Sequence, residues 1–301
     1  MKISIVIVNY NREKVILSCL KSLEKVRCKG HNLTTVVVDN ASTDKSVELI
    51  EKYFPGVKII KNKENLGFSQ GNNLGIKYAL ENYSEYILLL NNDTLVEPGF
   101  LINLLESFQI ARNIGIVAPK IYFAPGFEYH QNRYKVNQKG KVIWYAGGKL
   151  DWKNIAGVHE GLDEVDKGQF NQSKEVEYAS GCCMLIKREV FEQIGFFDNR
   201  YFLYLEDIDF CIRAKKNKFK IFFQPKAIIW HKNLGTDKYT TRSRQAYYYT
   251  RNRLIFGFSH APLRTKIALI RESLKFLFGG NFWQKKAVQD FYSGKFAKGS
   301  F

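Results

Sequence analysis

Residues 86–93 read Tyr-Ile-Leu-Leu-Leu-Asn-Asn-Asp, an apolar run that stops abruptly at three side chains with oxygen ligands. A short continuous apolar run is typical of a strand buried on both faces. In a parallel α/β sheet, ligands bind beyond the carboxyl ends of the strands, so Asp93 is expected where a phosphate or a metal ion binds. The Asn-Asn-Asp sequence alone fits an ordinary turn equally well. The segments around it decide between the two.

Three more apolar strands are predicted before this one, at residues 3–8, 35–38 and 57–60. A helical pattern follows each of them. This alternation predicts right-handed βαβ units in an open, mostly parallel sheet. Polar segments follow three of the four strands, and parallel strands bring their carboxyl ends to one edge of the sheet. The predicted site therefore lies where these polar segments meet, at residues 9–12, 39–44 and 91–93.

The charge of the chain indicates a polyanionic partner. Its 301 residues include 46 Lys and Arg against 29 Asp and Glu, which gives a net charge of +17. Nucleic acid, an anionic membrane face and a phosphorylated substrate all fit this excess. The sequence contains neither G-x-G-x-x-G after the first strand nor a G-x-x-x-x-G-K-[ST] motif. Neither a dinucleotide-binding fingerprint nor a P-loop is therefore present.

The cysteine usage and the hydropathy of the sequence indicate the cellular compartment of the protein. Five cysteines form no C-x-x-C pair and have no histidine at zinc-finger spacing. That usage favours a reducing, cytoplasmic compartment. No apolar stretch approaches the about 20 residues of a membrane span, so any contact with a membrane is expected to be peripheral, at its inner face.

Four motifs in order resemble those of the family 2 glycosyltransferases, at residues 5–12, 38–44, 65–73 and 90–93. The resemblance continues at residues 180–188, 195–198, 202–210 and 229–231, and it covers roughly residues 1–255. The sequences of these motifs are similar to those of the rhamnosyltransferase-like branch of the family. The resemblance implies the α/β fold called GT-A, an open and mostly parallel twisted sheet flanked by helices, here with a C-terminal helical tail.

The same resemblance suggests a division of the chain. Residues 1–120 are expected to form the half that binds the nucleotide sugar, and residues 121–235 the acceptor-binding and catalytic half. Residues 236–301 would be a basic, aromatic and helical extension. The segment 122–175 has no clear periodicity, and both acceptor recognition and an insertion without function are consistent with it.

The resemblance also implies roles on the donor side. Asp39 would accept a hydrogen bond from N3–H of the pyrimidine in a dTDP- or UDP-sugar, and Asp93 would close the family's D-x-D metal motif. Asn91 departs from that motif, because an amide oxygen is a weaker ligand than a carboxylate for Mg²⁺ or Mn²⁺. His231 would be a further metal or diphosphate contact, although a lone histidine after a strand is ordinarily a surface or packed residue. The other donor-side residues expected at the site are Asn9, Tyr10, Asn11, Arg12, Asn40, Ser42, Asn65, Gly67, Asn72 and Asn92.

Glu206 and Asp207 begin a predicted helix that has acidic residues at its start and basic residues at its end. Compensation of the helix dipole explains this pattern without any catalytic role. Sugar transfer from a nucleoside diphosphate needs a base for the acceptor hydroxyl, and the resemblance assigns that base to this pair. We expect Asp207 to be the base and Glu206 its neighbour, in a single displacement with inversion. Gly181 and Asp209 are expected on the acceptor side.

Two segments of the tail leave alternatives open. Residues 242–253 interleave tyrosines and arginines, which suits stacking on nucleic acid or contact with the donor diphosphate. No RNA-binding module is recognisable, so no nucleic-acid partner is expected. From Pro262 to Gly279, apolar residues at helical spacing alternate with basic ones. Such a helix fits a core or homodimer contact and an anionic membrane equally well.

The leading hypothesis is an inverting glycosyltransferase that uses a divalent metal. It would move rhamnose from dTDP-L-rhamnose, or a hexose from a UDP-sugar, to a hydroxyl of a glycan or lipid-linked acceptor in cell-surface polysaccharide synthesis. One alternative is a sugar-phosphate nucleotidyltransferase, whose glycine-rich basic loop is missing between Val8 and Lys14. The other is a basic protein without enzymatic activity that binds nucleic acid or membranes.

Overall fold

The computed structural model describes residues 1–234 and 238–301 of the chain. Its strands are β1 (Lys2–Asn9), β2 (Asn32–Asp39), β3 (Lys58–Lys61), β4 (Tyr86–Leu90), β5 (Thr94–Val96), β6 (Ile114–Phe123), β7 (Ile143–Tyr145), β8 (Gly148–Asp151), β9 (Ala156–His159), β10 (Lys174–Glu175), β11 (Cys183–Lys187) and β12 (Lys220–His231). One sheet runs in the order β10-β12-β6-β11-β4-β1-β2-β3, with β5 beside β12 and β7 beside β6. Strands β8 and β9 form a separate hairpin.

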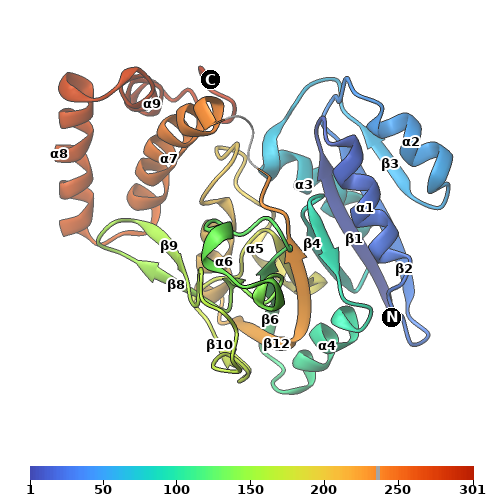
Figure 1. Ribbon diagram of the computed structural model, residues 1–301. Helices are drawn as coiled ribbons and strands as arrows, with labels where there is room; N and C mark the ends of the chain where they lie inside the picture. The colour runs from blue at the N-terminus through green and yellow to red at the C-terminus, as the bar shows by residue number, and fades with distance from the viewer. Residues whose placement is uncertain (235–237) are drawn as a thin grey trace.

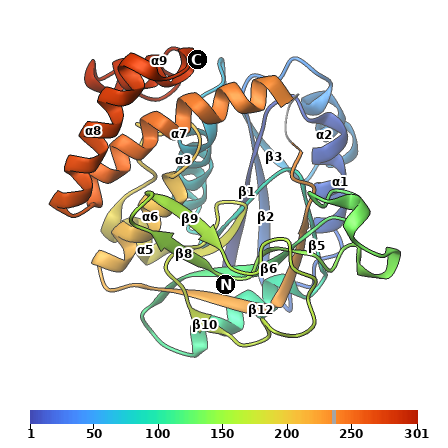
Figure 2. The ribbon, with the colours of Figure 1, turned by 60° about the vertical axis from the view of Figure 1, so that its left-hand side comes forward.

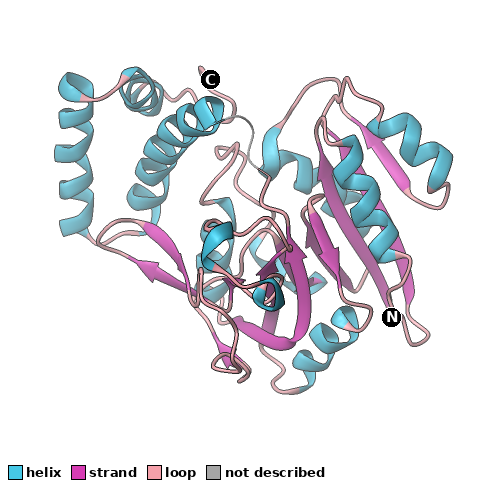
Figure 3. Ribbon diagram, in the orientation of Figure 1, coloured by secondary structure: helices cyan, strands magenta, loops and turns pink. Residues whose placement is uncertain are grey.

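The helices of the described residues are α1 (Glu13–Leu23), α2 (Ser46–Tyr53), α3 (Gly67–Glu81), α4 (Phe100–Glu106), α5 (Arg188–Ile194), α6 (Glu206–Lys216), α7 (Lys238–His260), α8 (Leu263–Gly279) and α9 (Phe282–Tyr292). Short 3-10 helices are η1 (Ser107–Gln109), η2 (Gln131–Arg133) and η3 (Val136–Gln138). Figure 3 shows how these helices flank the strands.

The N-terminal half is the predicted parallel sheet. Strand β1 pairs in parallel with β2 on one side and with β4 on the other, and β2 pairs in parallel with β3. Each of the four predicted strands is present. The apolar side chains of β1, β2 and β4 are largely buried, whereas Ile59 and Ile60 of β3, at the edge of the sheet, are half-buried. Figure 2 shows β1 to β3 between α3 on one side and α1 and α2 on the other. The register sets Asn9 beside Asp39, so the polar ends of β1 and β2 meet as expected.

The second half mixes strand directions. Strand β11 runs antiparallel to both β4 and β6, whereas β12 runs parallel to β6. Cys183, the first residue of β11, is paired with Leu90, the last residue of β4. The backbone N–H of Asn91 then donates to the carbonyl of Cys182 at 2.9 Å. The segment before β11 is thereby brought to the polar end of β4.

One expected strand end is wrong. The sequence predicts that the strand from Gly115 ends at Pro119, but β6 continues to Phe123. The pairing with β12 is irregular at this point, since Pro119 faces Gln224 whereas the next residue, Lys120, faces Ile228. Proline has no N–H for the ladder and is tolerated where the partner strand bulges. The bulge therefore lets the strand run through the proline.

The C-terminal helices form a group of their own. Figure 1 shows α7, α8 and α9 at the opposite end of the molecule from α1 and α2. Helix α9 packs against α7 and α8, and Tyr247, Tyr248 and Ala287 form a small buried cluster between them. The predicted boundary between the second and third parts of the chain, at residues 235–236, lies outside the described residues. The predicted insertion 122–175 contains β7, the β8–β9 hairpin and β10.

Candidate functional site

A network of short polar side chains joins the ends of β1 and β2. Asn9 is fully buried and its Nδ2 donates to Asp39 Oδ1 at 3.4 Å and to Ser42 Oγ at 3.3 Å. Ser42 in turn donates to both oxygens of Asp39, from its hydroxyl at 2.5 Å and from its backbone N–H at 2.9 Å. These contacts fix the Asp39 carboxylate at the edge of the sheet.

The residues after β1 tie this network to its surroundings. Asn11 has a φ of 50° and its Oδ1 accepts from the backbone N–H of Thr43 at 2.7 Å. Arg12 reaches the loop after β12, where its Nη2 donates to the carbonyl of Leu234 at 3.0 Å. Tyr10 is 45% exposed. The turn after β1 thus spans from the end of β2 to the end of β12.

The start of α3 is fixed by two asparagines. Asn40 Nδ2 donates to the carbonyl of Gly67 at 2.9 Å, and Asn65 Oδ1 accepts from the Gly67 N–H at 2.9 Å. Gly67 has a φ of 77°, and a Cβ there would lie 2.4 Å from the carbonyl oxygen of Phe202. Only glycine fits this position, because both the backbone angle and the close approach exclude a side chain. Asn72 is held inside α3, where its Nδ2 donates to a carbonyl one turn earlier at 2.9 Å.

The segment between β4 and β5 carries Asp93, the acidic residue predicted at the site. Asn92 Nδ2 donates to Asn9 Oδ1 at 2.9 Å, which joins this segment to the β1–β2 network. Asp93 Oδ1 lies 3.0 Å from His231 Nε2, and its Oδ2 accepts from the N–H of Leu234 at 3.2 Å. Burial opposes ionisation of Asp93, but the His231 ring and this N–H outweigh it and hold the pKa of the carboxyl below its usual range.

The same pair of atoms suits a divalent cation. Ligands about 2.1 Å from an octahedral ion and at right angles to each other lie about 3 Å apart, which matches the separation of Asp93 Oδ1 and His231 Nε2. His231 Nδ1 is buried and has no hydrogen-bond partner within the described part of the chain. No cluster of three or more His, Cys, Asp or Glu residues that could hold a metal is found among residues 1–234 and 238–301. Among the described residues, Asp93 and His231 are the two candidate ligands, and Asn91 is half-buried.

The predicted acidic pair lies at the first turn of α6. Asp207 accepts from the backbone N–H of Gly181 at Oδ2 and from that of Ile208 at Oδ1, both at 2.8 Å. Glu206 is buried, and its Oε2 has no partner among the described residues. Burial raises the pKa of Glu206 well above its usual range, and the adjacent Asp207 charge adds to the rise. Burial also raises the pKa of Asp207, against the pull of its two backbone donors.

The loop before β11 contacts both acidic segments, because its Gly181 N–H donates to Asp207 and its Cys182 carbonyl accepts from the N–H of Asn91, two residues before Asp93. Burial raises the pKa of the Cys182 thiol well above its usual range, and the carboxylates of Asp93 and Asp207 both add to the rise. A Cβ on Gly181 would lie 3.0 Å from the Phe68 ring and 3.4 Å from the Asp207 Cβ. The loop before β11 therefore links the start of α3, the end of β4 and the start of α6.

Residues 4–195 match the model of the family described as Glycosyl transferase family 2. The chain belongs to this family. The match takes in the donor-side motifs and Gly181, and it ends before Glu206 and Asp207.

Curated relatives of this family 2 member include a low-salt glycan biosynthesis hexosyltransferase of Haloferax volcanii, 29% identical over 73% of this chain and 63% of the relative. The N-acetylglucosaminyl-diphospho-decaprenol L-rhamnosyltransferase of Mycobacterium tuberculosis is 24% identical over 66% of each chain. A rhamnosyltransferase of Escherichia coli K12 is 23% identical over 80% of this chain and 93% of the relative. The chain thus spans slightly less than two thirds of the first two relatives.

Solved structures confirm the predicted GT-A fold of this family 2 chain. GalNAc-T7 with UDP, GalNAc and Mn²⁺ superposes with a TM-score of 0.61 at 16% identity, over 93% of this chain and 58% of that one. The Pyrobaculum calidifontis mannosyltransferase in complex with GDP-Man and Mn²⁺ gives a TM-score of 0.57 at 17% identity, over 99% and 76% of the two chains.

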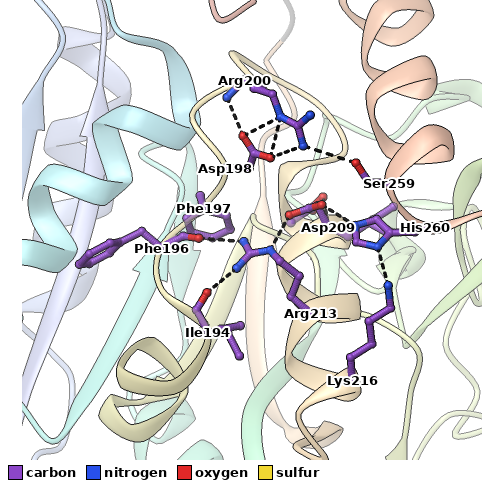
Figure 4. A network of polar contacts seen from close by, with 12 residues as sticks. Ile194, Phe196, Phe197, Asp198, Arg200, Asp209, Arg213, Lys216, Ser259 and His260 are labelled. Atoms are coloured by element: carbon purple, nitrogen blue, oxygen red, sulfur yellow. Dashed lines mark hydrogen bonds and ion pairs between the residues drawn. The ribbon is translucent and has the colours of Figure 1, made fainter.

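Asp209, predicted on the acceptor side of this family 2 site, has its carboxylate in a network of ion pairs (Figure 4). Oδ2 accepts from Arg213 Nε at 2.8 Å, and Oδ1 lies 2.6 Å from His260 Nε2 on α7. Burial opposes its ionisation, but these two partners outweigh it and lower the pKa of Asp209. Arg213 also donates to the carbonyls of Ile194 and Phe196. Asp209 thus joins α6 to α7 and to the loop after α5.

The prediction missed a hollow of about 420 Å³ among α7, α8 and α9, with Tyr204 from the turn before α6 on its wall. Its lining residues are Tyr204, Gln245, Ala246, Tyr249, Thr250, Arg253, Phe276 and Gln284. Burial raises the pKa of Tyr249, whereas the nearby Arg253, which also lines the hollow, lowers it. The sequence feature that could have indicated this hollow is the Tyr- and Arg-rich segment 242–253. Its composition suits contact with the donor diphosphate or with nucleic acid.

Proposed function

We propose that this family 2 member is an inverting glycosyltransferase that moves a sugar from a nucleoside diphosphate to a hydroxyl group. The observation that carries the proposal is the loop before β11, where the Gly181 N–H donates to the Asp207 carboxylate at 2.8 Å and the Cys182 carbonyl accepts from the N–H of Asn91, two residues before Asp93, at 2.9 Å. A base and a diphosphate-binding group are the two functions that such a transfer needs. One strand-end loop brings both to the edge of the sheet.

The donor proposed is dTDP-L-rhamnose or a UDP-hexose. Asp39 would accept a hydrogen bond from N3–H of the pyrimidine, and the contacts from Asn9 and Ser42 leave its carboxylate fixed for that purpose. The names of the relatives in Mycobacterium tuberculosis and Escherichia coli support a rhamnosyl donor, whereas the name of the Haloferax relative supports a hexose. A glycan or lipid-linked acceptor in cell-surface polysaccharide synthesis is proposed on the same ground.

In the proposed reaction, Asp207 removes the proton from the acceptor hydroxyl. The acceptor oxygen forms a bond to C1 of the sugar while the bond from C1 to the phosphate oxygen breaks, so the configuration at C1 inverts. The nucleoside diphosphate leaves with the electron pair of the broken bond. The ionised Asp207 holds its neighbour Glu206 in the protonated form, so only one carboxylate of the pair is charged. The hollow beside Tyr204 and Tyr249 is the proposed place of the acceptor.

A bound Mg²⁺ or Mn²⁺ would neutralise charge on the leaving diphosphate, and Asp93 and His231 would hold it. Arg12 and the loop that ends at Leu234 lie beside Asp93, and they would fix the diphosphate from the other side. Because the described residues offer only these two metal ligands, diphosphate oxygens and water would complete the coordination.

We extend the proposal to the parts of the chain. Residues 1–120 would bind the donor, residues 121–235 the acceptor, and residues 236–301 would support the acceptor side. None of the described helices has both the length and the apolar character of a membrane span. A place at the cytoplasmic face of a membrane, through peripheral contact, is part of the proposal.

The test is a thermal-shift panel of dTDP-L-rhamnose, several UDP-hexoses and inorganic polyanions, each with and without Mn²⁺. A donor at about 100 times its Kd adds about 2.7 kcal/mol to the free energy of unfolding. We expect one class of nucleotide sugar to raise the melting temperature, and Mn²⁺ to add to the shift only when that donor is present. Asp93→Ala should remove the part that depends on Mn²⁺. Binding of every polyanion with a steep salt dependence, and no preference for a nucleotide sugar, would contradict the proposal.

A further inference from the structure

The turn before α6 has an unusual backbone. Tyr204 and Leu205 have φ values of 78° and 70°, in the left-handed region that residues with a side chain rarely adopt. Leu205 is the N-cap residue of α6, where a side-chain oxygen usually accepts from the first turn. Leucine has no such oxygen, so the turn receives no support from its own cap. Contacts from outside must hold it, because strained backbone persists only where the surroundings fix it.

Asn252, on α7, supplies those contacts. Its Nδ2 donates to the carbonyl of Leu203 at 2.8 Å and to that of Tyr204 at 2.9 Å. Its Oδ1 accepts from Nε and Nη2 of Arg251, both at 3.2 Å. A guanidinium group only donates, so the amide oxygen must face Arg251 and the amide nitrogen must face the two carbonyls. The side chain is completely buried, and each of its polar atoms is used.

Arg251 connects this amide to the C-terminal segment. It is completely buried, and its Nη2 donates to the carbonyl of Ala297 at 2.6 Å. The guanidinium lies 5.2 Å and 5.3 Å from the ring centroids of Tyr247 and Tyr248. The buried Arg251 guanidinium, which is itself held by Ala297 and the two tyrosine rings, therefore fixes the orientation of the Asn252 amide.

The same turn also touches the donor side. The carbonyl of Phe202 accepts from the N–H of Phe68 at 2.7 Å, at the start of α3. The Phe202 ring stacks on Tyr248 with 5.1 Å between centroids and 13° between planes. Two residues after the strained pair comes Asp207, whose carboxylate meets the N–H of Gly181. A movement of this turn would shift the carboxylate relative to α3.

We propose that Asn252 is a positioning residue, which holds the Leu203–Leu205 turn and thereby places the Asp207 carboxylate against the donor. The inference rests on the proposed function, since it assigns Asp207 the role of base. On this proposal, the Tyr- and Arg-rich segment of α7 positions the base and does not bind phosphate.

The experiment compares Asn252→Ala and Asn252→Asp with Asn82→Ala. Asn252→Asp keeps the size of the side chain and an oxygen toward Arg251, but it replaces the two N–H donors with an oxygen. Asn82 also donates to a backbone carbonyl, at 2.8 Å from Tyr78 O, but at the end of α3 away from the turn. Turnover is followed as hydrolysis of the nucleotide sugar that stabilises the wild-type protein, with water in place of the acceptor. Hydrogen–deuterium exchange of residues 202–208 and of the Phe68 and Gly181 amides is measured beside it.

We expect kcat to fall at least tenfold in both Asn252 variants, with the KM for the donor within twofold of wild type. Exchange should become faster at residues 202–208 and at the Phe68 and Gly181 amides, and stay unchanged in β1 and β2. Asn82→Ala should leave kcat and exchange in the turn unchanged. Folded Asn252 variants with normal kcat, or variants in which KM rises as much as kcat falls, would overturn the inference. If the wild type neither binds nor hydrolyses any nucleotide sugar, the proposed function fails. Hydrogen–deuterium exchange at residues 202–208 still shows, independently of turnover, whether Asn252 holds the turn.

Discussion

Glu206 and Asp207 are neighbours in the sequence with opposite surroundings. Two backbone N–H groups stabilise the carboxylate of Asp207, whereas Glu206 has a buried oxygen with no partner among the described residues. A charge on Glu206 is therefore the less stable of the two, and the proton of the pair resides there. The contrast gives each residue its own test.

Asp207→Asn removes the proposed base and keeps the shape of the side chain. General base catalysis contributes about 10² to 10⁴ in rate, so kcat should fall by that order while donor binding persists. Turnover and the donor-dependent thermal shift measure the two effects on one sample. A folded variant with near-normal turnover would remove Asp207 from the role.

Glu206→Gln tests the buried proton. A carboxyl whose pKa is raised on folding stabilises the protein below its unfolded pKa, and this contribution is lost as the pH rises through the folded pKa. The contribution of Glu206 to the free energy of unfolding of wild type should therefore decrease from acidic to neutral pH. The glutamine variant should show no such decrease from this residue. Near pH 7 we expect the variant to be more stable than wild type, because the amide has no proton to lose when the protein unfolds.

Melting temperatures of the Glu206→Gln variant from pH 4 to pH 8 give the measurement. Glu106→Gln, at the exposed end of α4, is the matched control and should follow wild type at every pH. A glutamine variant at position 206 that is less stable than wild type at pH 7, with a gap that does not change with pH, would show that Glu206 is ionised there.

Among elements, α6 and α7 are joined by an ion pair. His260 lies near the end of α7, and its Nε2 is 2.6 Å from Asp209 on α6. A carboxyl whose pKa is lowered on folding contributes stability above its unfolded pKa and loses it as the pH falls through the folded pKa. His260→Ala should therefore destabilise the protein by about 1–3 kcal/mol near neutral pH.

The difference between His260→Ala and wild type should shrink below about pH 4, where the carboxyl of an unfolded aspartate takes up its proton. Denaturant unfolding at several pH values measures it. His130→Ala is the control, because His130 is largely exposed where it meets Asp163 and should change stability little. A constant difference from pH 3 to pH 8 would mean that the pair with Asp209 is not its source.

Helix α8 presents an apolar ridge to its surroundings. Leu263 is 74% exposed and Phe278 is 83% exposed, at opposite ends of the helix, and Leu274 is 47% exposed between them. The exposed basic residues beside the ridge are Arg264, Arg271 and Lys275. Of the two interpretations of this helix, insertion of the ridge into an anionic membrane surface accounts for both its apolar and its basic residues.

The double variant Leu274→Glu and Phe278→Glu tests this contact. We expect wild type to bind vesicles that contain anionic lipid, to bind more weakly at higher salt, and to ignore purely zwitterionic vesicles. The double variant should lose most of the binding. A double variant of two exposed apolar residues elsewhere, Tyr83→Glu and Val136→Glu, should retain it. A concentration-dependent dimer of wild type that the α8 double variant abolishes, with no vesicle binding, would assign the ridge to a second copy of the chain.

At the scale of the whole molecule, the sequence predicted best what is local or periodic. The parallel strands β1 to β4 and the polar ends of β1, β2 and β4 follow from apolar runs and the direction rule for parallel strands. The contact between Asn9 and Asp39 is a direct result of this register. The start of α6 was also readable, because helix ends carry their own residue preferences.

Features that depend on distant partners were not readable. Pro119 seemed to end a strand, since the bulge that accommodates it lies in β12, far along the chain. The segment 242–253 looked uniform, yet the helix turns Asn252 toward the strained turn and Tyr249 toward the hollow. The partner of Asp209 could not be predicted either, because His260 is 51 residues away in the sequence. Such contacts follow from tertiary packing and leave no periodic trace in the sequence.

The contact of Arg251 with Ala297 has a consequence for how the molecule acquires activity during its synthesis. Asn252 reaches back 49 residues to Leu203, and Arg251 reaches forward 46 residues to Ala297. Strands β1 to β4 are complete far earlier, and N-terminal parts fold first as the chain emerges at about 5–20 residues per second. A nascent chain would therefore complete these strands roughly 10 to 40 seconds before residue 297 is added. The proposed base would be held in place only after α7 and the segment at Ala297 have docked.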